Sequence, residues 1–265
     1  MATKKGNFIR GIVGPLIFRK LNGKQVVSSR IPAGTMKQTE ATKQAAGNFG
    51  AASGLSKHFR LMNQSLIAGH NDSGMFNRLT SRFVESLNKS RDREDKGFKF
   101  STDSFDSLTG FDFNINSPVA DRMSLLPGLI LEDSQLRLFY LETPEEIDLK
   151  FPVKSMDCEI IASMAVFNLK KGQRVFTSDL QQRVVKKKNP VINDLEFRFN
   201  APQGCLCIVS ILLKYYSVMD IRGTLVNTKQ FSPAAICGAI VTPGTFKNTD
   251  NRNWLVMDKV KLCRR

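Results

Sequence analysis

The sequence predicts an α+β fold in which an N-terminal β-hairpin and two amphipathic helices precede an antiparallel β-sandwich of the immunoglobulin-like kind. Asn22 and Gly23 separate two β-prone runs, apolar residues recur every three or four positions between residues 45 and 87, and apolar and polar residues alternate from residue 98 onward. These patterns are typical of a tight turn, of helices and of strands, respectively. The last change of pattern predicts a domain boundary, with a basic module at residues 1–97 and the sandwich at residues 98–265.

The predicted hairpin turns at Asn22 and Gly23, because both residues tolerate the positive φ angles of a type I′ turn. This two-residue loop sets a register in which Phe18 faces Val27. Helical sequence follows, so we expect no third strand nearby, and two strands alone are marginally stable in water. The residues that would dock on another sheet form the predicted assembly arm: Leu16, Phe18, Asn22, Gly23 and Val27.

A long helix is predicted from about residue 35 to residue 68, since Thr35 to Gln38 fits a capping box. Gly47, Gly50 and Gly54 lie within it, so we expect either a broken helix or a very close helix–helix contact. The apolar stripe of this helix contains Ala45, Phe49, Ala52, Leu55, Phe59, Met62 and Leu66.

A second, shorter helix is predicted from the spacing of Phe76, Leu79, Phe83 and Leu87, with Asp72 or Ser73 as its cap. The mixed charges of residues 89–97 then predict a solvated linker. After the linker, alternation predicts strands at residues 111–115, 136–140, 147–151 and 195–199, and longer apolar runs predict strands at 158–169, 205–216 and 234–241.

The cysteines favour buried, reduced thiols. Their number is odd, no C-x-x-C pair occurs, and the only histidines, His58 and His70, are distant in sequence. We therefore expect no zinc site and a reducing, cytoplasmic compartment. No apolar run is long enough to cross a bilayer, so we expect no membrane contact. Four thiols lie in apolar or strand-like contexts: Cys158, Cys205, Cys207 and Cys237.

The formal net charge of +15 lies mostly in the first part of the chain. Residues 1–100 hold 18 Lys and Arg against 6 Asp and Glu, a balance of +12, whereas residues 101–265 hold 21 against 18, a balance of +3. This excess predicts an acidic partner, either nucleic-acid phosphates or an acidic protein surface. The candidate contacts are Arg10, Arg19, Lys20, Lys24, Arg30, Arg78 and Arg82.

No catalytic or cofactor signature occurs in the sequence. The carboxylate pairs Glu132–Asp133 and Glu145–Glu146 fall at turns, where charged residues are common without any acid–base role. No serine lies in a G-x-S-x-G context, and no glycine-rich span continues as a phosphate loop. We therefore expect no catalytic residues, no cofactor and no metal.

The segment GIVGPLIFRKLNGKQVVSSRIPAGTMKQTEATKQAAGNFGAAS resembles the opening of a group of uncharacterised basic, β-rich proteins encoded by Bacteroidota. The resemblance covers about 45 residues, implies a bacterial source and supplies no catalytic residues, because the group has no established activity. It rests on Gly11, Gly14, Phe18, Asn22, Gly23, Lys24, Thr39 and Phe49.

We expect a non-enzymatic structural or assembly protein that forms a homo-oligomer, with the hairpin as an arm that pairs with a sheet edge of another subunit. Acidic turns at residues 103–106 and 142–148 offer the basic arm a counterpart. A nucleic-acid-binding protein that uses the basic first third is the alternative. An enzyme whose site is assembled from dispersed residues is the third possibility.

Overall fold

The computed structural model describes residues 2–32, 34, 37–67, 71–92, 97–140, 146–217, 223–247, 252–258, 260 and 262. The chain divides into two compact units, Met1–Ala46 and Gly47–Arg265, which are described separately. This division lies earlier in the chain than residues 97 and 98, where the sequence pattern changes. The reason is that the helices after residue 47 share one hydrophobic core with the sheets.

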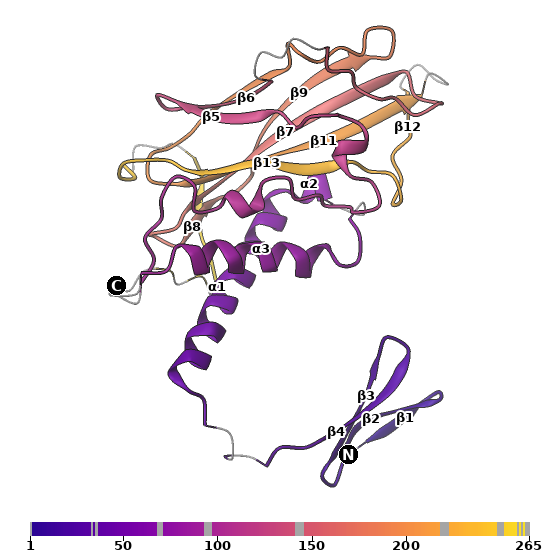
Figure 1. Ribbon diagram of the computed structural model, residues 1–265, viewed down its shortest axis with the longest axis vertical. Coiled ribbons are helices and arrows are strands. Elements are labelled where there is room, and N and C mark those ends of the chain that lie inside the picture. The colour runs from indigo at the N-terminus through magenta and orange to yellow at the C-terminus, as the bar shows by residue number, and fades with distance from the viewer. Residues whose placement is uncertain are drawn as a thin grey trace. The chain divides into compact units, whose positions relative to one another are not determined.

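The N-terminal unit contains a four-stranded antiparallel sheet in the order β1-β2-β3-β4 (Figure 1). The predicted register is confirmed, because Phe18 pairs with Val27. The expectation that no third strand lies nearby is wrong, since β2 pairs with β3 and β1 pairs with β2. The strands are β1 (Thr3–Lys5), β2 (Phe8–Val13), β3 (Leu16–Leu21) and β4 (Lys24–Ser29).

A second tight turn explains the extra strands. Gly14 has a φ of 55°, and Pro15, whose ring fixes its own φ, follows it. Gly14 and Pro15 therefore reverse the chain in a segment that the sequence pattern predicts as one strand. The predicted turn, which joins β3 to β4, has φ angles of 48° at Asn22 and 80° at Gly23, as a type I′ turn requires.

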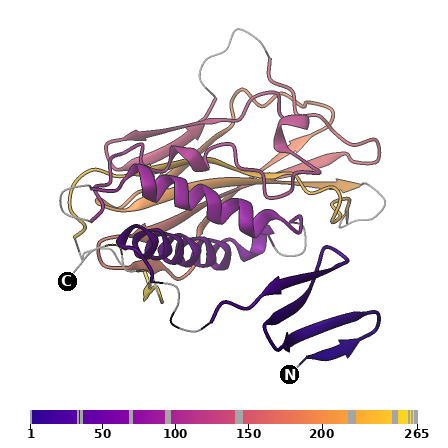
Figure 2. The same ribbon diagram turned by 60° about the horizontal axis from the view of Figure 1, so that its bottom comes forward.

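The long helix α1 (Glu40–Met62) is unbroken and begins later than predicted. Thr39 caps it, since the hydroxyl of Thr39 accepts the backbone N–H of Thr42 at 3.2 Å. The capping box predicted to begin at Thr35 is therefore wrong, and Thr35 itself lies outside the described residues. The predicted region continues as α2 (Gln64–Ile67), and the second predicted helix is α3 (Met75–Lys89). Helices α1 and α3 pack side by side (Figure 2).

Most of the apolar stripe is buried, with Leu55 and Phe59 fully so. Phe49 is an exception, because 59% of its surface is exposed. Phe76 of α3 is also exposed, and the Arg60 guanidinium covers its ring at 4.0 Å from the centroid. Ala45 is exposed as well, and the remaining residues of each predicted stripe are buried.

The glycines of α1 do not make the helix–helix contact that their spacing predicts. A Cβ atom at Gly54 would lie 2.6 Å from a methyl group of Val260, so the close approach is to the C-terminal segment. Gly47 and Gly50 face open space.

The second unit contains two antiparallel sheets. The small sheet has the order β10-β6-β5, from β5 (Gly128–Glu132), β6 (Gln135–Phe139) and β10 (Glu196–Asn200). In the large sheet β11 lies between β7 and β13, and β7 also pairs with β9. The strands of the large sheet are β7 (Asp157–Asn168), β8 (Gln173–Val175), β9 (Asp179–Lys186), β11 (Leu206–Ser217), β12 (Thr224–Leu225), β13 (Ala234–Val241) and β14 (Trp254–Val256). Two short 3₁₀ helices lie at Asp106–Leu108 and Val119–Asp121.

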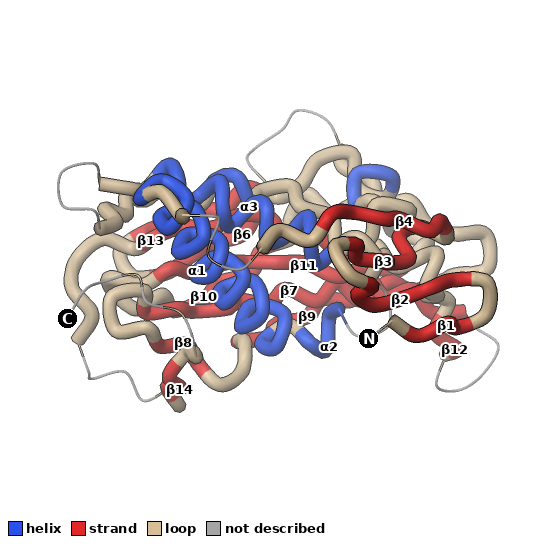
Figure 3. Tube along the Cα trace, turned by 90° about the horizontal axis from the view of Figure 1, so that it is seen from below, coloured by secondary structure: helices blue, strands red, loops and turns tan. Residues whose placement is uncertain are grey.

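The large sheet is covered on both faces. In Figure 1 the helices lie below it and strands β5 and β6 lie above it, and Figure 3 shows α1 and α3 lying across its strands. Ser163 on β7 donates to Asn63, between α1 and α2, at 2.7 Å, whereas Gly238 on β13 packs against Leu129 of β5. Nearly every residue of β7 and β11 is therefore buried.

Two of the predicted strands do not form continuous strands in the described part of the chain. Residues 111–115 contribute one isolated bridge, Asp112 to Ala235, and residues 147–151 contribute two, at Asp148 and Leu149. In both segments the inward apolar residues, such as Phe113 and Leu149, are buried, so the alternation marked burial without a continuous ladder. The predicted strands at 136–140, 158–169, 195–199, 205–216 and 234–241 correspond to β6, β7, β10, β11 and β13.

Candidate functional site

The N-terminal sheet leaves its apolar side chains uncovered. No described residue between 2 and 46 is buried. A sheet of three or more strands needs a covered hydrophobic face to be stable in water. The sheet exposes several large apolar side chains on its two faces. Val13, Leu16 and Val27 share one face with Phe18, whereas Ile12 and Leu21 lie on the other.

One of the two edges of this sheet is β4, which among the described strands pairs only with β3, and the other edge is β1. In a two-residue hairpin the residues that flank the turn, here Leu21 and Lys24, form a hydrogen-bonded pair, and the pairs then alternate. Gln25, Val27 and Ser29 therefore direct their backbone N–H and C=O groups outward. β4 presents an open hydrogen-bonding edge with Lys24 at its start.

The side chain of Gln25 stabilises the sheet from within. Its Oε1 accepts the backbone N–H of Ile9 at 2.8 Å, and its Nε2 donates to the carbonyl of Ile9 at 3.0 Å. The β2–β3 ladder ends at the pair Gly11 and Phe18. Beyond that pair, the side-chain amide of Gln25 provides the hydrogen bonds that a backbone partner on β3 would otherwise make to Ile9. Hydrogen bonds therefore connect all four strands, although the sheet has no buried core of its own.

The predicted basic contacts divide between the two units. Five of them belong to the N-terminal unit and are exposed: Arg10, Arg19, Lys20, Lys24 and Arg30. Among the described residues none of these five forms a salt bridge. Residues 1–39 hold eight Lys and Arg and no Asp or Glu, so their charge is uncompensated within that segment. The ammonium of Lys20 lies 4.2 Å from the centre of the Phe8 ring.

Arg78 and Arg82 belong to α3 in the second unit, where their charges are paired. Arg78 binds the carboxylate of Asp72 and donates to the carbonyl of Asp112 at 3.1 Å. Its guanidinium also lies 4.9 Å from the centre of the Phe111 ring. Arg82 pairs with Glu85 at 3.3 Å. Arg78 is thus committed to internal contacts, and it anchors the start of α3 to the loop before the sheets.

Asp72, one of the two predicted caps of α3, lies at the centre of this contact. Gly74 occupies the cap position, and its N–H donates to Asp72 at 2.7 Å, while the N–H of Ile115 donates at 3.2 Å. Burial alone would raise the pKa of Asp72, but Ile115, Arg78 and Gly74 bind its charged form, so the pKa lies below the ordinary value. The carboxylate is a structural anion.

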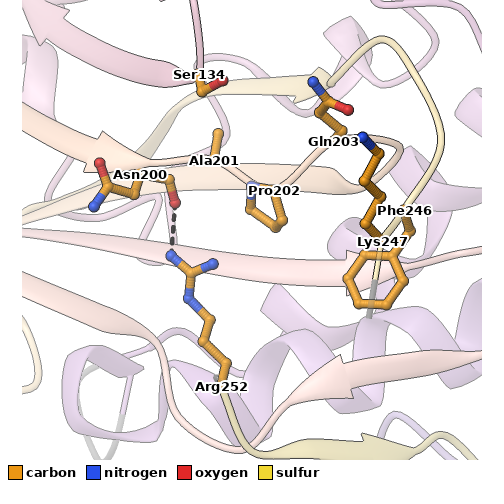
Figure 4. Close-up of a pocket in the computed structure, with 8 residues that line it drawn as sticks. All are labelled: Ser134, Asn200, Ala201, Pro202, Gln203, Phe246, Lys247 and Arg252. Carbon is orange, nitrogen blue, oxygen red and sulfur yellow. Dashed lines mark hydrogen bonds between the residues drawn. The ribbon is translucent and has the colours of Figure 1, made fainter. Parts of the chain in front are cut away.

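A cavity of about 360 Å³ lies where the small sheet meets the C-terminal part of the chain (Figure 4). Arg252 donates to the carbonyl of Asn200 at 2.6 Å and to Asp179 at 3.1 Å, and Lys247 lines the same cavity. Cationic and amide groups suit a small anion, but the guanidinium of Arg252 is already bound to the carboxylate of Asp179. The main effect of Arg252 is to donate a hydrogen bond to the outward-facing carbonyl of Asn200 on β10.

The predicted buried thiols are confirmed for Cys158, Cys205, Cys207 and Cys237, which are all buried and unbridged. Burial raises the pKa of Cys158 and of Cys237, so both stay protonated at neutral pH. Cys263 lies outside the described residues. These thiols behave as small apolar side chains.

Of the two histidines, His70 lies outside the described residues. His58 is buried and accepts the Nε–H of Arg174 at 3.2 Å through Nδ1. Arg174 is buried too, and it donates to the carbonyls of Val175 and Phe176. This cluster joins α1 to β8.

In the carboxylate pair Glu132–Asp133, the carboxylate of Glu132 binds the guanidinium of Arg137 at 2.8 Å. In the pair Glu145–Glu146, Glu145 lies outside the described residues. Within the described ranges, no three His, Cys, Asp or Glu side chains gather closely enough to hold a metal ion. None of the described helices combines the length and apolar character that a membrane span requires.

Sequence reasoning missed the open edge of β5, because an edge is a property of strand order. The signal that could reveal the N-terminal sheet is Gly14–Pro15 between two apolar runs. Comparison of the chain with protein-family models, curated proteins and solved structures finds no match.

Proposed function

We propose that this chain is a non-enzymatic structural protein that assembles into a homo-oligomer through its N-terminal sheet. The observation that carries the proposal is a four-stranded sheet with no buried residue, exposed apolar side chains and an open edge at β4. Such a sheet gains apolar burial and backbone hydrogen bonds by docking on another subunit. Leu16, Phe18 and Val27 remain its proposed contact residues.

The second unit supports this division of roles because it has a complete core of its own. Every buried residue of the described chain follows Ala46. Removal of the N-terminal sheet therefore costs the second unit none of its buried side chains, so that unit should fold alone.

The test is deletion of residues 1–31, followed by sedimentation velocity and thermal unfolding. We expect the full chain to sediment as an oligomer and the truncated chain as a smaller species with its own cooperative unfolding transition. A monomeric full chain, or a truncated chain that no longer folds, would contradict the proposal.

Nucleic-acid binding through the same sheet is the second candidate. Eight Lys and Arg without one acidic residue in positions 1–39 favour it, because phosphates bind such unpaired cations. No base-reading motif accompanies these charges, so binding would be electrostatic and independent of sequence.

We further propose a reducing, cytoplasmic compartment, supported by four buried thiols without a disulfide. We also propose that the two sheets of the second unit form a sandwich of the immunoglobulin-like kind. It is supported by a three-stranded antiparallel sheet, which packs Leu129 against Gly238 of a larger antiparallel sheet. The helical layer on the far face of the large sheet is an addition to that architecture.

A further inference from the structure

The small sheet has two edges, and only one of them is blocked. On β10, Gln181 of β9 binds both the N–H and the C=O of Arg198, and Arg252 binds the carbonyl of Asn200. These are the outward groups of β10, because Phe197 and Phe199 between them pair inward with β6. Side chains thus take the place of a further strand along this edge.

The opposite edge is β5, and no strand among the described residues pairs with its outer side. Glu132 and Gln135 flank a two-residue turn and form a hydrogen-bonded pair. Alternation from this pair directs the outer N–H and C=O groups of β5 to Leu129 and Leu131. The sequence of β5, GLILE, has no charge before Glu132. β5 is therefore an open, apolar edge of the kind that accepts an added strand.

We propose that β4 of one copy pairs antiparallel with β5 of a second copy. This inference rests on the proposed self-assembly and names its contact. The outward groups of Gln25 and Val27 meet those of Leu131 and Leu129, so two hydrogen-bonded pairs form. In this register Lys24 stands opposite Glu132, and Val26 stands opposite Ile130.

Charge selects this register and this partner. Glu132 is 49% exposed while it binds Arg137, so a second cation can reach it. Two copies of β4 pairing with each other about Val27 would instead place Lys24 opposite Arg30, which is a like-charge pair. A shift of the β4–β5 register by two residues would set Glu132 opposite Val26 or Asn22 and would lose the ion pair.

The apolar faces also match. Leu129 and Leu131 share the inner face of the small sheet with the buried residues Leu136 and Leu138, to which they are paired. In the proposed register Val27 lies beside Leu129 on that face. Phe18 is the cross-strand partner of Val27 and therefore continues the same face. The contact would therefore place Phe18 and Val27 on the same face of one continuous sheet as Leu129 and Leu131.

The first test reverses charge. Lys24→Glu alone and Glu132→Lys alone should each weaken self-association about tenfold, since each puts like charges opposite one another. The double variant Lys24→Glu/Glu132→Lys should recover self-association, because opposite charges then face each other again at every contact, with their positions exchanged. Lys5→Glu on the far strand β1 and Glu85→Lys, which breaks an ion pair with Arg82, are the matched controls and should leave assembly unchanged.

The second test is a cross-link between separately labelled copies. Lys24 and Glu132 would form a non-hydrogen-bonded pair, whose Cα separation of about 4.5 Å suits a disulfide. A mixture of Lys24→Cys and Glu132→Cys chains should form a covalent heterodimer on oxidation, whereas Lys24→Cys mixed with Ser134→Cys should not.

The outcomes separate this inference from the proposed function. An oligomer without charge-swap recovery and without the selective cross-link overturns the β4–β5 contact and leaves self-assembly standing. A full chain that stays monomeric at every concentration overturns both. Reciprocal exchange, with β4 of each copy on β5 of the other, would close a two-fold dimer, whereas one-way exchange would give rings or filaments.

Discussion

Phe59 shows how much one buried aromatic side chain contributes to the second unit. Its ring is fully buried and lies 6.3 Å from the ring of Phe83 and 6.1 Å from that of Phe113, measured between centroids. It therefore joins α1 to α3 and to the loop before the sheets. Truncation would leave a cavity that these rigid elements cannot close.

We expect Phe59→Ala to lower the free energy of unfolding by about 3–5 kcal/mol. Phe49→Ala on the same helix is the control and should change it by less than about 1 kcal/mol, because the Phe49 ring is mostly exposed. Urea denaturation of both variants measures the difference. Equal effects of the two substitutions would contradict the assignment of the buried stripe.

His58 makes stability depend on pH. Burial holds its pKa below the ordinary value of 6.5, and the neighbouring charges of Arg174 and Lys57 lower it further, although the backbone of Asp258 partly opposes them. Below pH 6.5 the unfolded chain therefore binds a proton that the folded chain resists. The contribution of His58 to stability is complete above its unfolded pKa and declines as the pH falls below that value.

The measurement is the free energy of unfolding at about pH 8 and about pH 5.5 for the native chain and for His58→Gln. The native chain should lose more stability on acidification than the variant, because the side-chain oxygen of a glutamine can accept from Arg174 without binding a proton. An identical loss in both chains would show that His58 titrates in the folded protein as it does in the unfolded one.

At the level of elements, the glycines of α1 separate packing from helix propensity. Gly54 is held against Val260, whose β-branched side chain has little freedom to move away, whereas Gly50 faces open space. The C-terminal segment therefore approaches the helix only where a side chain is missing.

Gly54→Ala should destabilise the protein by about 1–3 kcal/mol, since a Cβ atom would overlap a methyl group of Val260. Gly50→Ala should stabilise it by up to about 1 kcal/mol through helix propensity alone. Chemical denaturation of the two variants compares these opposite effects. A stabilising Gly54→Ala would mean that the C-terminal segment is not docked on α1.

Local rules predicted those elements in which one short signal determines the geometry. The β3–β4 register follows from Asn22–Gly23, and the strongly apolar β7 and β11 follow from the length of their runs. The start of α1 was misplaced because two threonines can cap it. Thr39 is favoured by Glu40, whose charge suits the first turn. β9 escaped prediction because DLQQRVVK lies at a sheet edge, where both faces can remain polar.

The candidate contacts were predicted in part. The exposed cations of the N-terminal sheet follow from composition, because no acidic residue lies near them in sequence. The internal role of Arg78 does not, since it depends on Phe111 and Asp112, which are more than 30 positions away. The blocked edge of β10 likewise depends on Gln181 and Arg252 from other parts of the chain.

At the scale of the whole molecule, net charge gives the two proposed functions opposite responses to salt. Each chain carries +15, so copies that assemble repel one another at long range, and added salt screens this repulsion. Nucleic-acid binding responds in the other direction, because cations that neutralise phosphates release counterions and lose affinity as salt rises.

We expect self-association of the protein alone to strengthen between about 50 and 200 mM salt, while binding to any DNA duplex weakens by orders of magnitude over the same range. Sedimentation velocity, with and without a DNA of arbitrary sequence, measures both in one titration. Lys5→Glu should lower affinity for DNA, since it removes positive charge, and should leave self-association unchanged, since it does not touch β4. Complexes that form only with DNA and dissociate as salt rises would favour the nucleic-acid function, whereas salt-insensitive binding of one particular DNA sequence would contradict the electrostatic mechanism itself.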